Sequence, residues 1–148
     1  MDKRIQEATD LFEEVLIYGT ERVLKSVEHP LWKEYSPEQM QVLKLISKEE
    51  SMTAGRLALL QGVHKSAISS RLKKLVDKEL VAIKPSGDKR EKLLTLTEKG
   101  QDVVVQSKQV LDEYISSLLS DHVNDQEIEQ FLVTFRKLNE ILKMDGVK

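Results

Sequence analysis

The sequence contains no cysteine among its 148 residues. This absence excludes disulfide bonds, iron–sulfur clusters, zinc sites with thiolate ligands, cysteine nucleophiles and switching by thiol oxidation. No apolar run approaches the roughly 20 residues that a membrane-spanning helix needs. The N-terminal segment carries acidic residues where a signal peptide would have its apolar core. We therefore expect a cytoplasmic protein that makes no membrane contact.

Motifs for catalysis, metals and cofactors are also lacking. The three histidines, His29, His64 and His122, do not follow the spacing of a zinc site. Ser120 and Asp121 precede His122, but three neighbours in the chain cannot converge as the side chains of a hydrolase triad do. The six glycines form no phosphate-binding loop. We expect no enzyme activity, no metal and no cofactor, although spacing does not address a metal site assembled from distant residues or across a dimer.

Helical periodicity dominates both ends of the chain. Apolar residues recur at three- and four-residue steps over residues 2–28, 97–119 and 124–142. Pro30 is expected to stop the first helix, because the residue before a proline is pushed out of the α region. Asn124, with Glu127 three residues later, predicts a capping box at the start of the last helix. Terminal helices with wide apolar faces need something to pack on, and in a chain of this length a second copy of the chain is a natural partner.

The middle of the chain predicts shorter helices. Ser36, Pro37 and Gln39 together are typical of a helix start, because they supply an N-cap, a proline in the first turn and a capping-box partner. Thr53 is expected to cap a second helix that ends at Gly62. A third helix is expected to follow directly.

Residues 54–73 have the features of a helix–turn–helix. Ala58 is small at the point where two helices would cross, and Gly62, four residues later, tolerates the positive φ of a turn. Val63 is expected to fill the gap between the helices, and Ile68 is expected to anchor the second helix to the core.

The second helix of this pair, over residues 64–79, is amphipathic. At about 100° per residue its apolar side chains gather on one face. The opposite face carries hydroxyls and one cation: Ser66, Ser70 and Lys73. A helix that enters the major groove of DNA needs small residues for close approach, donors for base edges and an N-terminus whose amides favour phosphate. A solvated helix face has a similar composition, so the segment that follows decides between the two interpretations.

Two short apolar runs, 80–84 and 92–96, flank Gly87 and Asp88 and predict a β-hairpin. After a helix of this kind, a charged hairpin tip is typical of a wing that lays a cation in the minor groove. Arg90 suits that role because narrow A·T-rich minor grooves concentrate negative potential. Asp88 is expected to hold the guanidinium of Arg90 by a bidentate pair.

The distribution of charge supports this interpretation. The chain has 23 Lys and Arg against 25 Asp and Glu, and a net charge of −2 argues against a histone-like nucleic-acid binder. Residues 64–92, however, carry nine basic and four acidic side chains, a net charge of +5, and the remainder carries −7. A basic segment that coincides with the helix and hairpin is what a phosphate-binding surface requires.

Taken together, these features resemble the MarR family of winged-helix regulators. The resemblance rests on the order of elements, the stretch LALLQGVHKSAISSRLKKLVDKELV, the Asp88-x-Arg90 wing and the Leu-Thr-Glu-Lys-Gly segment at 96–100. It implies a homodimer in which the first helix and the last two helices form the interface. It also implies a pseudo-palindromic operator, commonly bound by a repressor that a small ligand releases. Two residues depart from the family pattern, Gln61 and Arg71, where apolar residues are usual.

The expected fold is mainly α, a winged helix–turn–helix with a small β-hairpin wing plus N- and C-terminal dimerisation helices. It is expected as a single domain over 1–148, with the winged helix–turn–helix at 36–96 and the dimerisation region at 1–30 and 97–148.

The predicted function is a sequence-specific transcriptional regulator that binds double-stranded DNA as a homodimer, a repressor that a small-molecule effector releases. The candidate DNA-binding residues are His64, Lys65, Ser66, Ser69, Ser70, Lys73, Asp88 and Arg90. The alternative is a winged-helix dimer that docks another protein without binding DNA. A docking face would show exposed apolar anchors, and residues 64–92 offer few of them.

Overall fold

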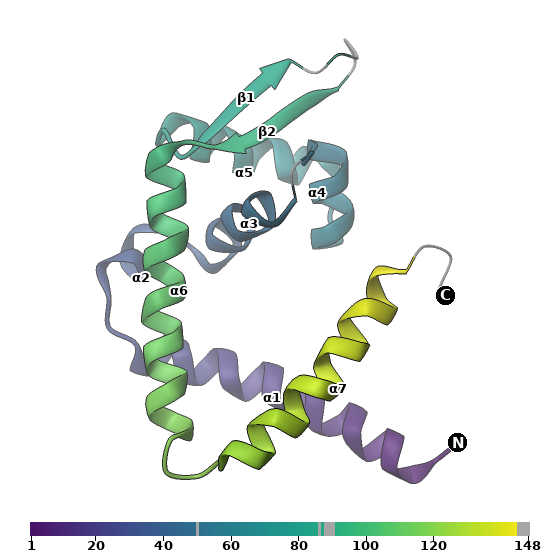
Figure 1. The fold of residues 1–148 in the computed structure, drawn as a ribbon. Coiled ribbons are helices and arrows are strands. Elements are labelled where there is room, and N and C mark those ends of the chain that lie inside the picture. Colours follow the sequence, from purple (N-terminus) through teal and green to yellow (C-terminus); the bar gives the residue numbers. More distant parts are fainter. Residues whose placement is uncertain (50, 86, 88–90, 145–148) are drawn as a thin grey trace. The chain divides into compact units, whose positions relative to one another are not determined.

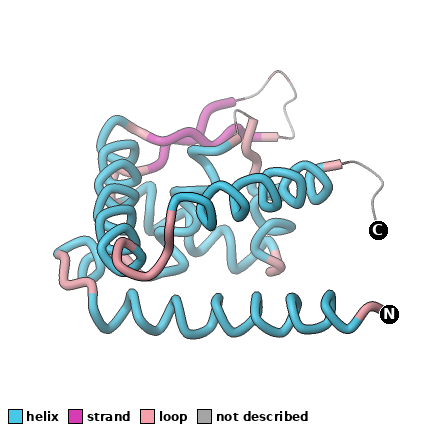
Figure 2. Tube along the Cα trace, turned by 60° about the horizontal axis from the view of Figure 1, so that its bottom comes forward, coloured by secondary structure: helices cyan, strands magenta, loops and turns pink. Residues whose placement is uncertain are grey.

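The computed structural model describes residues 1–49, 51–85, 87 and 91–144. Within these residues the chain forms helices and one two-stranded sheet, whose strands are magenta in Figure 2. The elements, labelled in Figure 1, are α1 (Lys3–Ser26), α2 (Pro30–Glu34), α3 (Pro37–Lys48), α4 (Ala54–Gln61), α5 (Lys65–Asp77), β1 (Val81–Pro85), β2 (Lys92–Leu96), α6 (Glu98–Leu119) and α7 (Asp125–Lys143). The predicted mainly α fold with a β-hairpin wing is confirmed.

The predicted helix starts are confirmed at the level of hydrogen bonds. At α3 the backbone N–H of Gln39 donates to Ser36 Oγ, and the N–H of Ser36 donates to Gln39 Oε1, both at 3.1 Å. At α7 the N–H of Glu127 donates to Asn124 Oδ1 at 2.9 Å, and the N–H of Asn124 donates to Glu127 Oε1 at 3.2 Å. Each reciprocal pair satisfies two backbone donors that the first turn of a helix leaves without partners.

The short helix α2 was missed by the sequence prediction, which treated Pro30 only as the stop of the first helix. Pro30 is also the first residue of α2, a position where proline costs nothing because its missing N–H has no intrahelical partner. His29 Nδ1 caps the helix by accepting the N–H of Leu31 at 3.2 Å. Leu31 and Tyr35 are both buried in the core.

The core lies where α3, α4, α5 and the hairpin meet. Its fully buried large side chains come from the three helices, the segment between α3 and α4, and the residue before β1: Val42, Leu43, Met52, Leu57, Ile68, Leu75 and Leu80. Burial of each large apolar side chain contributes roughly 1.5–3 kcal/mol to folding. The core therefore fixes α5 and the hairpin, which carry the predicted DNA contacts.

The hairpin is antiparallel and its register pairs Val81 with Leu96 and Pro85 with Lys92. Its inner face buries Val81 and Leu94, and the N–H of Leu94 donates to the carbonyl of Met52 at 2.9 Å. This bond ties β2 to the segment before α4. The wing is thereby joined to the helix–turn–helix by backbone as well as by side chains.

The Leu-Thr-Glu-Lys-Gly segment leads from β2 into α6 and is hydrogen-bonded to the turn that follows α5. Glu79 turns the chain with a φ of 62°, in the left-handed region. Thr97 Oγ1 donates to the carbonyl of Glu79 at 2.6 Å and accepts the N–H of Gly100 at 3.0 Å, while the N–H of Thr97 donates to the carbonyl of Leu80 at 3.0 Å. Thr97 thus closes the turn and caps α6 at the same time.

The terminal helices differ from the core elements. The chain separates into two compact units, Met1–Leu111 and Asp112–Lys148. Neither α1 nor α7 has a buried residue within the chain. Their exposed apolar side chains include Leu11, Val15 and Leu16 of α1, and Phe131 and Leu142 of α7. No helix of the described chain is long and apolar enough to cross a membrane.

Candidate nucleic-acid interface

The turn between α4 and α5 has the geometry that the sequence predicts. Gly62 ends α4 in the left-handed conformation, with φ 64° and ψ 35°. The N–H of Val63 donates to the carbonyl of Ala58 at 3.0 Å, and the N–H of Gly62 donates to the carbonyl of Leu59 at 3.2 Å. These bonds satisfy the last carbonyls of α4 as in a Schellman ending. Ala58 is buried and Val63 packs against the core, so the turn positions the start of α5.

The helix α5 presents an uncapped N-terminus. His64 is the N-cap residue, with extended backbone, and its side chain makes no capping hydrogen bond within the described residues. The amides of the first turn of a helix carry partial positive charge and bind anions. The start of α5 is therefore open to a phosphate group from outside the chain.

The six candidate residues at 64–73 lie together at α5. All of them are exposed: His64, Lys65, Ser66, Ser69, Ser70 and Lys73. On the opposite side of the helix, Ile68, Leu72 and Leu75 are buried. The core therefore fixes which side of α5 faces outward. The other two candidates, Asp88 and Arg90, lie outside the described residues.

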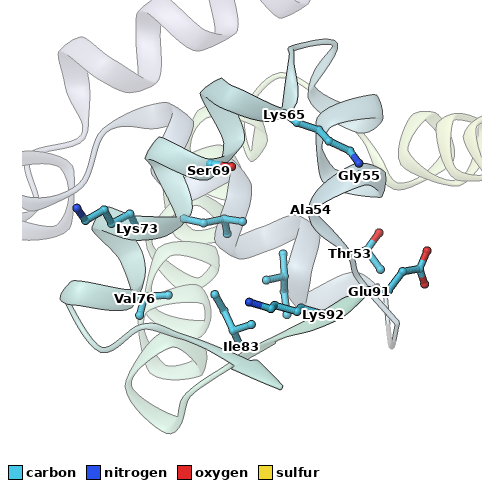
Figure 3. Close-up of a pocket in the computed structure, with 12 residues that line it drawn as sticks. Thr53, Ala54, Gly55, Lys65, Ser69, Lys73, Val76, Ile83, Glu91 and Lys92 are labelled. Atoms are coloured by element: carbon cyan, nitrogen blue, oxygen red, sulfur yellow. The ribbon is translucent and has the colours of Figure 1, made fainter. Parts of the chain in front are cut away.

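A hollow of about 500 Å³ lies between α5 and the wing. Figure 3 shows Lys65, Ser69 and Lys73 along α5, with Ile83 and Lys92 on the hairpin. Apolar side chains of both elements also line the hollow: Leu72, Val76, Ile83 and Leu94. It thus combines apolar walls with three lysines and one acidic residue, Glu91.

The start of α4 completes the hollow. Thr53, Ala54 and Gly55 line it, and Lys65 Cε lies 3.5 Å from the position that a Cβ on Gly55 would occupy. Figure 3 shows the Lys65 side chain reaching across to Gly55. Sequence reasoning missed these residues because they are distant from α5 in the chain, and it counted Lys92 only as part of the basic segment.

Exposed apolar anchors are scarce on this surface. Among the described residues of 64–92, Ile83 is the one large hydrophobic side chain that is strongly exposed, at 46%. Three lysines and one glutamate line the hollow, and this net positive charge fits a polyanion better than an apolar protein surface.

Comparison with known proteins finds relatives among transcriptional regulators. The sequence profile of the MarR family matches residues 35–91. The chain is 32% identical over 145 residues to the uncharacterised HTH-type transcriptional regulator YdgG of Bacillus subtilis (strain 168), covering 96% of this chain and 95% of the relative. It is 32% identical over 127 residues to the HTH-type transcriptional regulator TcaR of Staphylococcus aureus (strain Newman), covering 84% of this chain and 82% of the relative.

Solved structures share the fold. A MarR family protein from Bacillus stearothermophilus superposes with a TM-score of 0.76 at 18% identity, over 97% of this chain and 99% of that one. Staphylococcus aureus MarR, solved in complex with salicylate and kanamycin, superposes with a TM-score of 0.71 at 20% identity, over 97% of each chain.

Proposed function

This chain is a DNA-binding transcriptional regulator of the MarR family, and we propose that it works as a homodimeric repressor on a pseudo-palindromic operator. The observation that carries the proposal is the exposed row of hydroxyls and lysines on α5, held outward by the buried face of the same helix. Short side chains allow α5 to enter a major groove, where hydroxyls read base edges. In this proposal Ser66, Ser70 and Lys73 contact bases or nearby phosphates.

The proposed phosphate contacts lie at the start of α5. His64 and Lys65 flank its uncapped N-terminus, and Ser69 lies beside the hollow. Phosphate contacts of this kind fix the register of a protein on the duplex without reading its sequence. The sequence supplies the wing contact: Arg90 enters the neighbouring minor groove and Asp88 orients it.

The partner in the proposed dimer is a second copy of this chain. The apolar side chains that α1 and α7 leave exposed, among them Phe12, Val15, Phe131 and Leu142, are typical of an interface that closes on a two-fold axis. Two α5 helices related by that axis would address half-sites about 34–36 Å apart, one helical turn of DNA.

A small-molecule effector is the second part of the proposal. The hollow beside α5 has the volume of an ordinary ligand site, and Staphylococcus aureus MarR has been solved with salicylate. Lysine ammonium groups above apolar walls suit an aromatic carboxylate, which would compete with DNA for the same lysines. Titration of salicylate into the protein–DNA complex should release the DNA; release that stays unchanged up to millimolar salicylate argues against this ligand class.

The rival function, docking of another protein, is less well supported because the surface lacks apolar anchors other than Ile83 among its described residues. The test is fluorescence anisotropy with a duplex selected from random DNA. Binding by two chains per duplex, at an affinity that falls steeply with salt, supports the repressor. Equal, weak binding to every duplex supports the docking module.

A further inference from the structure

The two residues that depart from the family pattern are hydrogen-bonded to each other. Arg71 Nη1 donates to Gln61 Oε1 at 2.8 Å. The amide of Gln61 then donates from Nε2 to Gln41 Oε1 at 3.0 Å. We name these three residues, Gln41, Gln61 and Arg71, the polar clasp. It connects α3, α4 and α5 through one chain of side-chain hydrogen bonds.

The chemistry of the clasp favours a fixed arrangement. The Gln61 amide is used at both ends, because its carbonyl accepts from the guanidinium and its NH₂ group donates to Gln41. Hydrogen bonds to a charged donor are shorter and stronger than those between neutral groups. Gln61 and Arg71 are half-buried, so water competes for the Arg71–Gln61 bond less well than for the exposed Gln61–Gln41 bond.

The clasp holds one edge of α5. With Ile68 at zero and 100° per residue, Arg71 lies at about −60° around the helix and Ser69 at about +100°. The Ser69 edge faces the hollow and the wing, and the Arg71 edge is tied to α4 and α3. Gln61 is the last residue of α4 and directly precedes the Gly62 turn. The clasp therefore acts at the joint that sets the direction of α5.

We propose that the polar clasp is a positioning device that fixes the rotation of α5 about its axis, so that Ser66, Ser70 and Lys73 face the groove together. This inference rests on the proposed DNA-binding function. An apolar pair at positions 61 and 71 would fill the same joint by packing, without directional bonds. Arg71 thus acts on DNA recognition through α5 and not by contact with a base.

A double-mutant cycle tests the proposal. The variants are Arg71→Leu, Gln61→Leu and the two combined. The affinity of each is measured for a selected duplex and for an unrelated duplex, at a temperature where circular dichroism shows that the variant is folded. Each single variant should lower the ratio of specific to nonspecific affinity by about threefold to tenfold, because a smaller share of molecules holds α5 in the competent orientation. The double variant should recover most of the ratio, since two leucines can pack together. Arg71→Lys should rescue part of it by donating a single hydrogen bond.

The matched control is Arg56→Leu. It removes a cation and the exposed Arg56–Glu49 pair at 3.0 Å, which links α4 to the end of α3. Its ratio of specific to nonspecific affinity should equal that of the wild type. The proposal is overturned if the single variants keep the wild-type ratio, or if their losses simply add in the double variant.

A second measurement tests the clasp independently of the proposed DNA-binding function. Hydrogen exchange of the α5 amides should be faster in each single variant than in the wild type and should return toward wild type in the double variant. If the wild type bound every duplex equally, the proposed sequence-specific function would be wrong. Hydrogen exchange of the α5 amides would then still show whether the clasp orders α5. Equal exchange in all four proteins overturns the clasp whatever the DNA result.

Discussion

Gly100, in the first turn of α6, lies directly against the carbonyl oxygen of Leu80, with no room for a β-carbon between them. The obstacle is backbone, which cannot swing aside as the end of a side chain would. Gly100→Ala should therefore lower the free energy of unfolding by about 1–3 kcal/mol, the usual cost of overpacking. Denaturant unfolding followed by circular dichroism measures this loss. Gly55→Ala is the control, because its new β-carbon would meet side-chain atoms at ordinary contact distance, the nearest being the flexible Lys65 at 3.5 Å; an equal loss in both variants would contradict the account.

The conformation of Gly62 predicts a second effect on stability. No described heavy atom lies within 4 Å of the place where its β-carbon would be, but its φ is +64°. Gly62→Ala should cost about 1–2 kcal/mol, because the left-handed region is unfavourable for a residue with a β-carbon. Gly62→Asn should cost less, since asparagine adopts this conformation more readily. Thermal unfolding of both variants gives the comparison, and equal losses would show that the left-handed conformation does not set the cost.

Substitution of Lys73 should change the salt dependence of DNA binding. Its ammonium group is exposed on α5 and borders the hollow. If it neutralises one phosphate, Lys73→Met should weaken binding to all duplexes and reduce the slope of log K against log salt by about 1. Lys33→Met removes the same charge from an exposed position on α2 that does not line the hollow, and it should leave the slope unchanged. A wild-type slope for Lys73→Met would remove this residue from the interface.

Arg90 is expected to supply the minor-groove contact of the wing. Arg90→Ala should weaken binding to the selected duplex by about 1–3 kcal/mol, roughly fivefold to 150-fold. It should leave the oligomeric state unchanged, because the proposed interface lies on the terminal helices. Lys84→Ala, in β1, is the control for general loss of charge on the hairpin. Equal effects of the two substitutions would show that the wing contributes charge alone.

Because the terminal helices expose apolar faces, one charged side chain introduced on such a face should dissociate the proposed dimer. Phe131 is 56% exposed and stacks on Phe135, with ring centroids 4.0 Å apart. In the proposed dimer this pair is covered, so Phe131→Glu should yield monomers by light scattering and weaken operator binding. Leu59→Glu is matched in type, since Leu59 is 77% exposed but lies on α4, and it should remain dimeric. A dimer that tolerates Phe131→Glu would place the interface elsewhere.

Much of the fold could be predicted because its signals are local. The capping boxes at Ser36 and Asn124 and the left-handed turn at Gly62 each depend on residues within four positions of one another. The buried face of α5 follows from helical spacing alone. These predictions are confirmed because the local preference and the tertiary packing agree.

What the sequence did not indicate depends on residues that are distant in the chain. The hollow combines Thr53, Lys65 and Lys92 from three parts of the sequence. Gln61 and Arg71 each look unfavourable when considered alone, and only the folded chain shows that each is the other's partner. The helix α2 was missed because Pro30, which stops the helical pattern of residues 2–28, is also the first residue of α2. The chain separates into two compact units. These units do not test the prediction of one domain over 1–148, which stays a prediction.

The central claim is that two copies of this chain read DNA through α5. Selection of bound sequences from random duplex DNA by the purified full chain, read by sequencing, tests it most directly. The account predicts an inverted repeat whose half-sites lie about 10–10.5 base pairs apart from centre to centre. A pool that remains random after repeated rounds would contradict the account and favour a protein-docking module.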